Sequence, residues 1–258
     1  MATTDVTLYS VAEGAAWITL NRPTARNALS SALIGEVFAH LEAANVDTHV
    51  RCIVITGSGS AFCSGADLKD SPGEMVHSAR VIAYPELLAA IQDSQKPVIA
   101  AVNGPAFAGG LGLIGAADIA IGANQAVFSF SEVRIGVIPA VISVVCLPKL
   151  GRHHAMKLFL TGERFSAERA VEVGLLHRAV PAEQLSIAVA EEIEMIRQGG
   201  PNAVIECKRL VRRIPELTRE RAFAETAPWS ARLFASPEAQ EGMAAFREKR
   251  SAAWLENH

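Results

Sequence analysis

Residues 103–112 read Asn-Gly-Pro-Ala-Phe-Ala-Gly-Gly-Leu-Gly and connect a predicted strand to a predicted helix. Each glycine inside a helix costs about 1 kcal/mol relative to alanine, so close packing or a ligand has to offset Gly109 and Gly110. The start of a helix offers unpaired amides and the positive end of the helix dipole, which suit a developing negative charge. The stretch therefore predicts a strand–loop–helix unit at which an anion could be stabilised.

An uncharged run surrounds this loop. Residues 97–117 hold no charged side chain over 21 positions, which is long enough to cross a bilayer. Gly104-Pro105 divides the run into a strand at residues 97–102 and a helix at residues 109–117. We therefore expect a buried unit, and with no leader pattern at the N-terminus we expect a cytoplasmic protein.

Alternating strands and helices are predicted around this unit. Further apolar runs predict strands at residues 17–21, 52–57 and 118–122. Residues 30–47 have a helical apolar pattern with Ser30 as N-cap, and residues 73–93 are mostly helical in pattern. From residue 182 onward only helical patterns follow, which indicates an α/β core with a helical C-terminal section. We place the core at residues 1–198 and the helical region at residues 199–258.

Composition excludes several functions. The 258 residues are half hydrophobic and carry a formal net charge of -3, which argues against a nucleic-acid partner. The cysteines have no metal-ligand spacing and are expected to be buried free thiols in a reducing compartment; they are Cys52, Cys63, Cys146 and Cys207.

A GxGxxG pattern at residues 110–115 suggests a dinucleotide site, with Glu132 at a suitable distance beyond it. In that fold, however, the first glycine lies in the turn directly after the strand, and here residues 103–109 intervene. We expect no nicotinamide or flavin. A second loop, Ala-Phe-Cys-Ser-Gly-Ala-Asp-Leu-Lys at residues 61–69, follows a buried strand, and its small residues let a ligand approach the backbone. An ordinary turn is an equally good interpretation of that loop alone.

An ordered set of short motifs runs through nearly the whole chain. They are LNRP at 20–23, NAL at 27–29, FCSGADLK at 62–69, VNG at 102–104, GG at 109–110, DIAI at 118–121, SEV at 131–133, GVIP at 136–139, LTGERFSA at 160–167 and GL at 174–175. In this order and spacing the chain resembles the crotonase superfamily, the enoyl-CoA hydratase/isomerase family. The resemblance implies an α/β fold, a crotonase-type spiral of ββα units with a C-terminal helical trimerisation region. It also implies a CoA thioester substrate, no separate cofactor, no membrane partner, and a homotrimer or dimer of trimers.

The same resemblance assigns roles to residues. The amides of Ala66 and Gly109 form an oxyanion hole, and Glu132 is a catalytic carboxylate. The positions expected at the substrate are Ser64, Asp67, Leu68, Lys69, Gly110, Gly112 and Lys249. Lys249 matches a position that reaches CoA from a neighbouring subunit, although a solvated helix face explains a lysine there equally well.

One family position departs from the pattern. Hydratases of this family generally carry two glutamates, and this chain has Gly112 at the first position and Glu132 at the second. The segment at residues 132–143 looks most like the bacterial branch named for 3-methylglutaconyl-CoA hydration. In that branch the first position is also glycine, and isomerases of the family likewise keep only the second glutamate.

Glu132 has an apolar sequence environment, and desolvation would raise its pKa toward the range that suits a general acid/base. A structural pair with Arg134 is the competing interpretation. Another carboxylate could compensate for Gly112, and the candidates are Asp70, Glu74 and Glu86. We rank an enoyl-CoA hydratase first, then a 3-enoyl-CoA to 2-enoyl-CoA isomerase, and last an acyl-CoA-binding protein without turnover.

Overall fold

The computed structural model describes residues 5–67 and 81–255. Its main sheet has the strand order β1-β2-β3-β4-β6-β9, and each described pair is parallel except β1 with β2. These strands are β1 (Thr7–Ala12), β2 (Ala15–Leu20), β3 (Cys52–Gly57), β4 (Val98–Val102), β6 (Ile119–Ala123) and β9 (Arg178–Val180). A small second sheet contains β5 (Ala106–Phe107), β7 (Val127–Ser129) and β8 (Phe165–Ser166).

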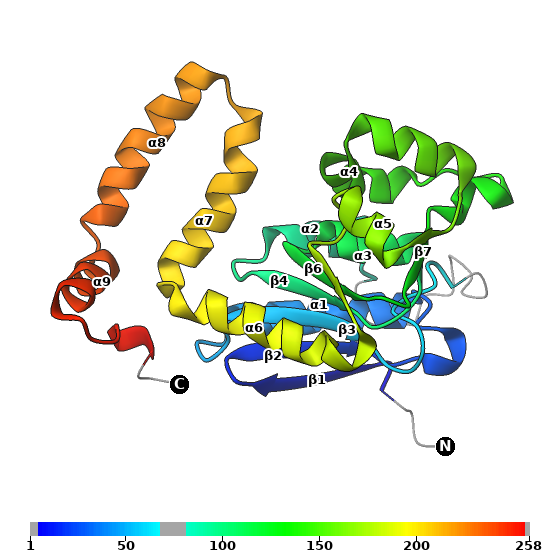
Figure 1. Cartoon of the computed structure of the whole chain (residues 1–258), viewed down its shortest axis with the longest axis horizontal. Helices are drawn as coiled ribbons and strands as arrows, with labels where there is room; N and C mark the ends of the chain where they lie inside the picture. The colour runs from blue at the N-terminus through cyan, green and yellow to red at the C-terminus, as the bar shows by residue number, and fades with distance from the viewer. Residues whose placement is uncertain (1–4, 68–80, 256–258) are drawn as a thin grey trace.

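Helices lie against the main sheet and also continue beyond it (Figure 1). They are α1 (Ser31–Val46), α2 (Tyr84–Asp93), α3 (Gly109–Ala116), α4 (Ala140–Thr161), α5 (Ala167–Glu172), α6 (Leu185–Gln198), α7 (Pro201–Arg213), α8 (Arg219–Phe234) and α9 (Pro237–Glu248). Within residues 5–67 and 81–255, no helix has the length and apolar character needed to cross a membrane.

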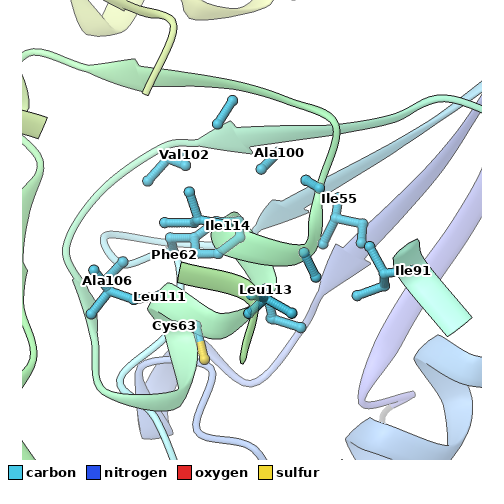
Figure 2. Packing of buried hydrophobic residues seen from close by; sticks show 14 of the residues in the cluster. Ile55, Phe62, Cys63, Ile91, Ala100, Val102, Ala106, Leu111, Leu113 and Ile114 are labelled. Atoms are coloured by element: carbon cyan, nitrogen blue, oxygen red, sulfur yellow. The ribbon is translucent and has the colours of Figure 1, made fainter. Parts of the chain in front are cut away.

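The central strands are apolar throughout because both of their faces are covered. In β3, Ile53 and Ile55 belong to the cluster that contains side chains of α1, α2 and α3, whereas Cys52 and Val54 pack with α6. Figure 2 shows the first cluster at close range, with Phe62 from the loop after β3 beside α3. The core thus fixes that loop and α3 relative to each other.

The strands and helices predicted from clear apolar patterns are confirmed. Strands β2, β3, β4 and β6 lie within two residues of their predicted positions, and α3 begins at Gly109 as predicted. Helix α1 follows Ser30, whose hydroxyl accepts a hydrogen bond from the Leu33 amide at 3.3 Å. Of the helix predicted at 73–93, the structure describes α2, residues 81–83 are not helical, and the rest lies outside the described residues.

The sequence does not predict β1, β7 or β9. Strand β1 is half-exposed and joins β2 through Glu13 and Gly14, which have φ of 51° and 76°. Positive φ at both positions is typical of a tight two-residue hairpin turn. Strands β7 and β9 have three residues each, which is too short for a period to be recognised.

The C-terminal arm, residues 199–255, contains α7, α8 and α9 and extends away from the sheet (Figure 1). It is joined to the core through Lys208, whose Nζ lies 2.7 Å from the Asp118 carboxylate. Within the arm, Glu206 accepts a hydrogen bond from Trp229 Nε1 at 2.6 Å. No residue of α8 is buried.

The cysteine expectation needs one correction. Cys52, Cys63 and Cys146 are buried free thiols, as predicted, whereas Cys207 is exposed. Cys207 lies on α7 and lines an apolar groove between the arm helices.

Candidate active site

The loops after β3 and β4 run side by side. Cys63 forms a parallel bridge with Ala106, and its carbonyl accepts a hydrogen bond from the Phe107 amide at 2.9 Å. On its other side the first loop meets the start of α1, where the Leu29 amide donates to the Gly65 carbonyl at 2.8 Å. These contacts bring the two glycine-bearing loops of the sequence to one place.

Two backbone amides are unpaired at this junction. The bridge between Leu29 and Ala66 is made by the neighbours of Ala66, so the amide of Ala66 stays outside it. Gly109 is the first residue of α3, where no helical acceptor exists. Neither amide donates a hydrogen bond within the described residues. They are also close, since a Cβ built on Gly109 would lie 3.7 Å from the Ala66 nitrogen.

Glycine at position 65 makes this approach possible. Gly65 has φ of +92°, a conformation that favours glycine. A Cβ there would lie 3.0 Å from the Ala108 Cβ and 3.2 Å from the Gly109 nitrogen. Any side chain would therefore press into the second amide and separate the loops.

Ala108 is a site residue that the sequence does not reveal. It has φ of 45° and ψ of -119°, a conformation that L-residues adopt rarely and that costs about 1–3 kcal/mol. Its amide donates to the Ser129 carbonyl at 3.0 Å, and its carbonyl accepts from the Leu111 amide at 2.9 Å. Because ψ of Ala108 sets the plane of the next peptide, these bonds hold the Gly109 amide in its orientation.

Glu132 lies in a short 3-10 helix, η2 (Ser131–Ile135), directly after β7. The buried rings of Phe128 and Phe130 precede it. Its Oε2 atom is buried and has no hydrogen-bond partner among the described residues. Burial raises the pKa of the Glu132 carboxyl above its usual value, and a hydrogen bond from its own amide opposes part of that rise. A buried carboxylate oxygen without a partner is a group that can exchange protons with a ligand.

The competing pair with Arg134 is not formed. The Arg134 guanidinium donates to the carbonyls of Gly162 at 2.9 Å and Thr161 at 3.2 Å. Arg134 therefore anchors the end of α4 to η2 and does not neutralise Glu132.

Gly112 is buried in the first half of α3, and Tyr84 of α2 reaches it from the side. A Cβ built on Gly112 would lie 2.5 Å from the Tyr84 hydroxyl oxygen and 2.6 Å from the Ile142 Cγ2 atom. The hydroxyl donates a hydrogen bond to the Gly109 carbonyl. No sequence signal points to this tyrosine, since it lies outside every motif quoted above.

Three further positions predicted to contact the substrate lie on the two loops of the junction. Gly110 is at the junction, where a Cβ would press into the Cys63 carbonyl. Ser64 is half-buried there, with its amide donating to the Arg26 carbonyl at 3.0 Å. Asp67 is engaged by Arg22, with 2.8 Å between Nη2 and Oδ2, so its carboxylate fastens the loop.

Other predicted residues lie apart from the site or outside the described residues. Glu86 accepts a hydrogen bond from the Ala83 amide at 3.0 Å and so caps the start of α2. Lys249 is exposed at the end of α9 on the arm, away from α3 in the same chain (Figure 1). The predicted positions outside the described residues are Leu68, Lys69, Asp70 and Glu74.

The glycines of the GxGxxG pattern have a packing role. Gly115 is buried, and a Cβ there would lie 2.7 Å from the Cys146 Sγ atom of α4. Together with the contacts at Gly112, this explains why α3 has glycines where α4 packs closely on it. Among the described residues, no group of three His, Cys, Asp or Glu side chains is arranged to hold a metal ion.

Comparisons with known proteins bear on the family and the fold of the chain. The family profile described as "Enoyl-CoA hydratase/isomerase" matches residues 10–257. A probable mitochondrial enoyl-CoA hydratase of Dictyostelium discoideum is 37% identical over 92% of this chain and 86% of its own length. The 2,3-dehydroadipyl-CoA hydratase of Escherichia coli is 33% identical over 91% and 92%. A crystal structure of a putative enoyl-CoA hydratase/isomerase (crotonase) from Legionella pneumophila superposes with a TM-score of 0.89 at 34% identity, covering 98% of this chain and 100% of the other.

Proposed function

Since the chain belongs to the enoyl-CoA hydratase/isomerase family of enzymes, we propose that it hydrates a 2-enoyl-CoA thioester, with Glu132 as acid/base and with the enolate held by the amides of Ala66 and Gly109. The observation that carries this proposal is the buried, unpartnered Glu132 oxygen in the same part of the fold as two unpaired amides.

The two amides supply the electrophilic half of the reaction. When a thioester carbonyl accepts both hydrogen bonds, its oxygen can carry the negative charge that arises as water adds to the β-carbon. Removing one such donor from an oxyanion hole lowers kcat by about 10²–10³-fold in other enzymes, so the pair of amides would supply much of the rate acceleration. Because the amides belong to packed backbone, they are aligned before the substrate arrives.

Glu132 supplies the proton transfers. A carboxyl whose pKa is raised by burial holds a proton more firmly than an exposed one, which suits a group that takes up a proton and delivers it. In hydration it would accept a proton from the attacking water and give one to the α-carbon. No cofactor beyond the CoA part of the substrate is needed for either step.

Isomerisation of a 3-enoyl-CoA to a 2-enoyl-CoA is the second candidate. It is favoured by Gly112, because a single carboxylate can lift a proton and return it two carbons away. The hydratase names of the relatives favour the first candidate. An acyl-CoA-binding protein without turnover is third, since Glu132 and both amides are retained. For the assembly we propose a homotrimer or a dimer of trimers in which Lys249 reaches CoA bound to a neighbouring copy.

A steady-state assay with short and branched acyl-CoAs tests these candidates. Hydration removes the ultraviolet absorbance of a conjugated 2-enoyl thioester, whereas isomerisation of a 3-enoyl-CoA creates it. We expect loss of absorbance with a 2-enoyl-CoA. A gain with 3-enoyl-CoAs and no loss with 2-enoyl-CoAs would support the isomerase, and binding without either change would support the third candidate.

A further inference from the structure

The hydroxyl of Tyr84 occupies the space that a carboxylate would use if position 112 carried one. A Cβ on Gly112 would start 2.5 Å from this oxygen, so a larger side chain there requires Tyr84 to move. Ile142 closes the same space, with its Cγ2 atom 2.6 Å from that Cβ position. Gly112 and Tyr84 are therefore complementary: the lack of a side chain on one admits the hydroxyl of the other.

The hydrogen bond of this hydroxyl determines what it can still do. A phenol has one proton to donate and two lone pairs with which to accept. The proton is directed to the Gly109 carbonyl, in the residue whose amide belongs to the candidate oxyanion hole. The Leu113 backbone amide is directed at the same oxygen, so one lone pair remains to accept a hydrogen bond from a water molecule.

The charge state of the hydroxyl is fixed by its surroundings. Burial is the main cause that raises the pKa of Tyr84 well above its usual value; the neighbouring groups Cys63, Cys146 and Glu132 add to the rise, and a hydrogen bond from the Leu113 amide opposes it. The phenol therefore stays neutral at any pH at which the enzyme works, and it orients a ligand without removing its proton. Glu132 belongs to the same junction, because Ala108, which precedes Gly109, donates to the carbonyl of Ser129, three residues before Glu132.

We propose that Tyr84 does the water-orienting work of the missing first glutamate: its oxygen accepts one hydrogen bond from the attacking water while Glu132 takes the other proton. This inference rests on the proposed hydration and on the role of Glu132. As the water oxygen bonds to the β-carbon, the π electrons move into the thioester and form the enolate. The water proton passes to Glu132, and when the enolate collapses the α-carbon takes that proton back. Tyr84 keeps its own proton throughout.

The variant Tyr84→Phe tests this step because it keeps the ring and removes only the oxygen. A misplaced water lowers kcat for hydration of crotonyl-CoA by about 10- to 100-fold, with KM changed by less than about twofold. A second reaction needs no attacking water: exchange of the α-protons of butyryl-CoA in D₂O, followed by mass spectrometry. Because that exchange uses only the two amides and Glu132, Tyr84→Phe should leave its rate unchanged.

Tyr9 gives the matched control, since it stacks on His40 at 4.8 Å between ring centroids in another part of the fold. Tyr9→Phe should change neither rate. If Tyr84→Phe slows hydration and exchange equally, the hydroxyl acts through the Gly109 carbonyl on the oxyanion hole, and the water-orienting role is overturned. Unchanged hydration in the variant also overturns it while leaving the proposed function intact. A wild-type enzyme that exchanges α-protons but hydrates no enoyl-CoA overturns both.

Discussion

Apolar side chains are buried around the main sheet, whereas on the C-terminal arm they face outward. Leu33 and Ile91 have no exposed surface, but Phe223 and Phe246 of the arm are 67% and 86% exposed. The arm helices contact one another through polar groups, such as Arg213 of α7 and Glu225 of α8 at 2.9 Å. The apolar groove between them has a volume of about 510 Å³ and is left open by residues 5–67 and 81–255.

The difference indicates what each region needs to be complete. The core, with both candidate oxyanion amides and Glu132, finds its packing partners within the chain. An exposed apolar surface as large as that of the arm usually marks a surface where subunits associate. Exposed side chains on α4, such as Val144 and Met156, enlarge the apolar surface. Changes at the site should therefore alter turnover and leave assembly intact, and changes on the arm should alter assembly first.

The largest effect is expected for Gly109→Pro. Gly109 is the first residue of α3, where its amide has no helical acceptor, so the substitution removes the amide proton from the candidate oxyanion hole without removing a helical hydrogen bond. We expect turnover to be abolished while light scattering reports the wild-type assembly. Gly109→Ala is the control because it adds the same Cβ contact with Leu29 and keeps the amide. Wild-type turnover in a folded Gly109→Pro enzyme would remove Gly109 from the mechanism.

Glu132→Gln should have the next largest effect. It keeps the shape of the side chain and removes the titrating group. General acid–base catalysis typically raises the rate by about 10²–10⁴-fold. We expect kcat to fall by that factor, with binding of a saturated acyl-CoA changed much less. Glu163→Gln is the control, because Glu163 makes a surface pair with Lys157 at 3.0 Å. Near-normal turnover of Glu132→Gln would send the search to Asp70 and Glu74.

The arm provides the contrasting test. The double variant Phe223→Ser and Phe246→Ser removes two exposed aromatic side chains. We expect the wild-type protein to scatter light as a trimer or hexamer of the 27.4 kDa chain, and the variant to dissociate at micromolar concentration. The exposed Arg219→Ser on the same helix should keep the wild-type mass. A wild-type monomer would show that the exposed apolar surface has another purpose.

The smallest effect concerns stability and pH. Because folding raises the pKa of Glu132, the folded state favours the protonated carboxyl and loses stability as pH rises through the raised value, from the usual 4.5 upward. Glutamine cannot ionise. The midpoint of thermal unfolding of Glu132→Gln should therefore match wild type near about pH 4 and exceed it near about pH 8. A constant difference across this range would mean that the carboxyl is not buried in its charged form.

Much of this fold can be predicted from the sequence because its central strands are continuous apolar runs. The site loops can be located for a related reason, since Gly65 and Gly110 lie where neighbouring backbone atoms leave no room for a side chain. Glu132 stays ambiguous without the structure, because only the carbonyl partners of Arg134 exclude their pairing.

Tyr84 and Ala108 show where such prediction ends. Tyr84 reaches Gly112 across a contact between α2 and α3 that no spacing encodes, because the two residues meet only in the folded chain. Ala108 is an ordinary residue type in an unusual conformation, and its φ of 45° is held by the hydrogen bonds of its own amide and carbonyl to Ser129 and Leu111. Both depend on tertiary structure, which overrides local preference.

The conformation of Ala108 also bears on how the catalytic cycle begins. Its strain is present in the folded protein before any ligand binds, so the dipole of the Gly109 peptide does not have to rotate when charge develops on a substrate oxygen. In water, solvent dipoles must reorient around a new anion, and that reorganisation is a large part of the barrier. Ala108→Gly would relax the backbone and make the protein easier to fold. The same change would let the peptide turn, and the reorganisation avoided here would return as a slower reaction.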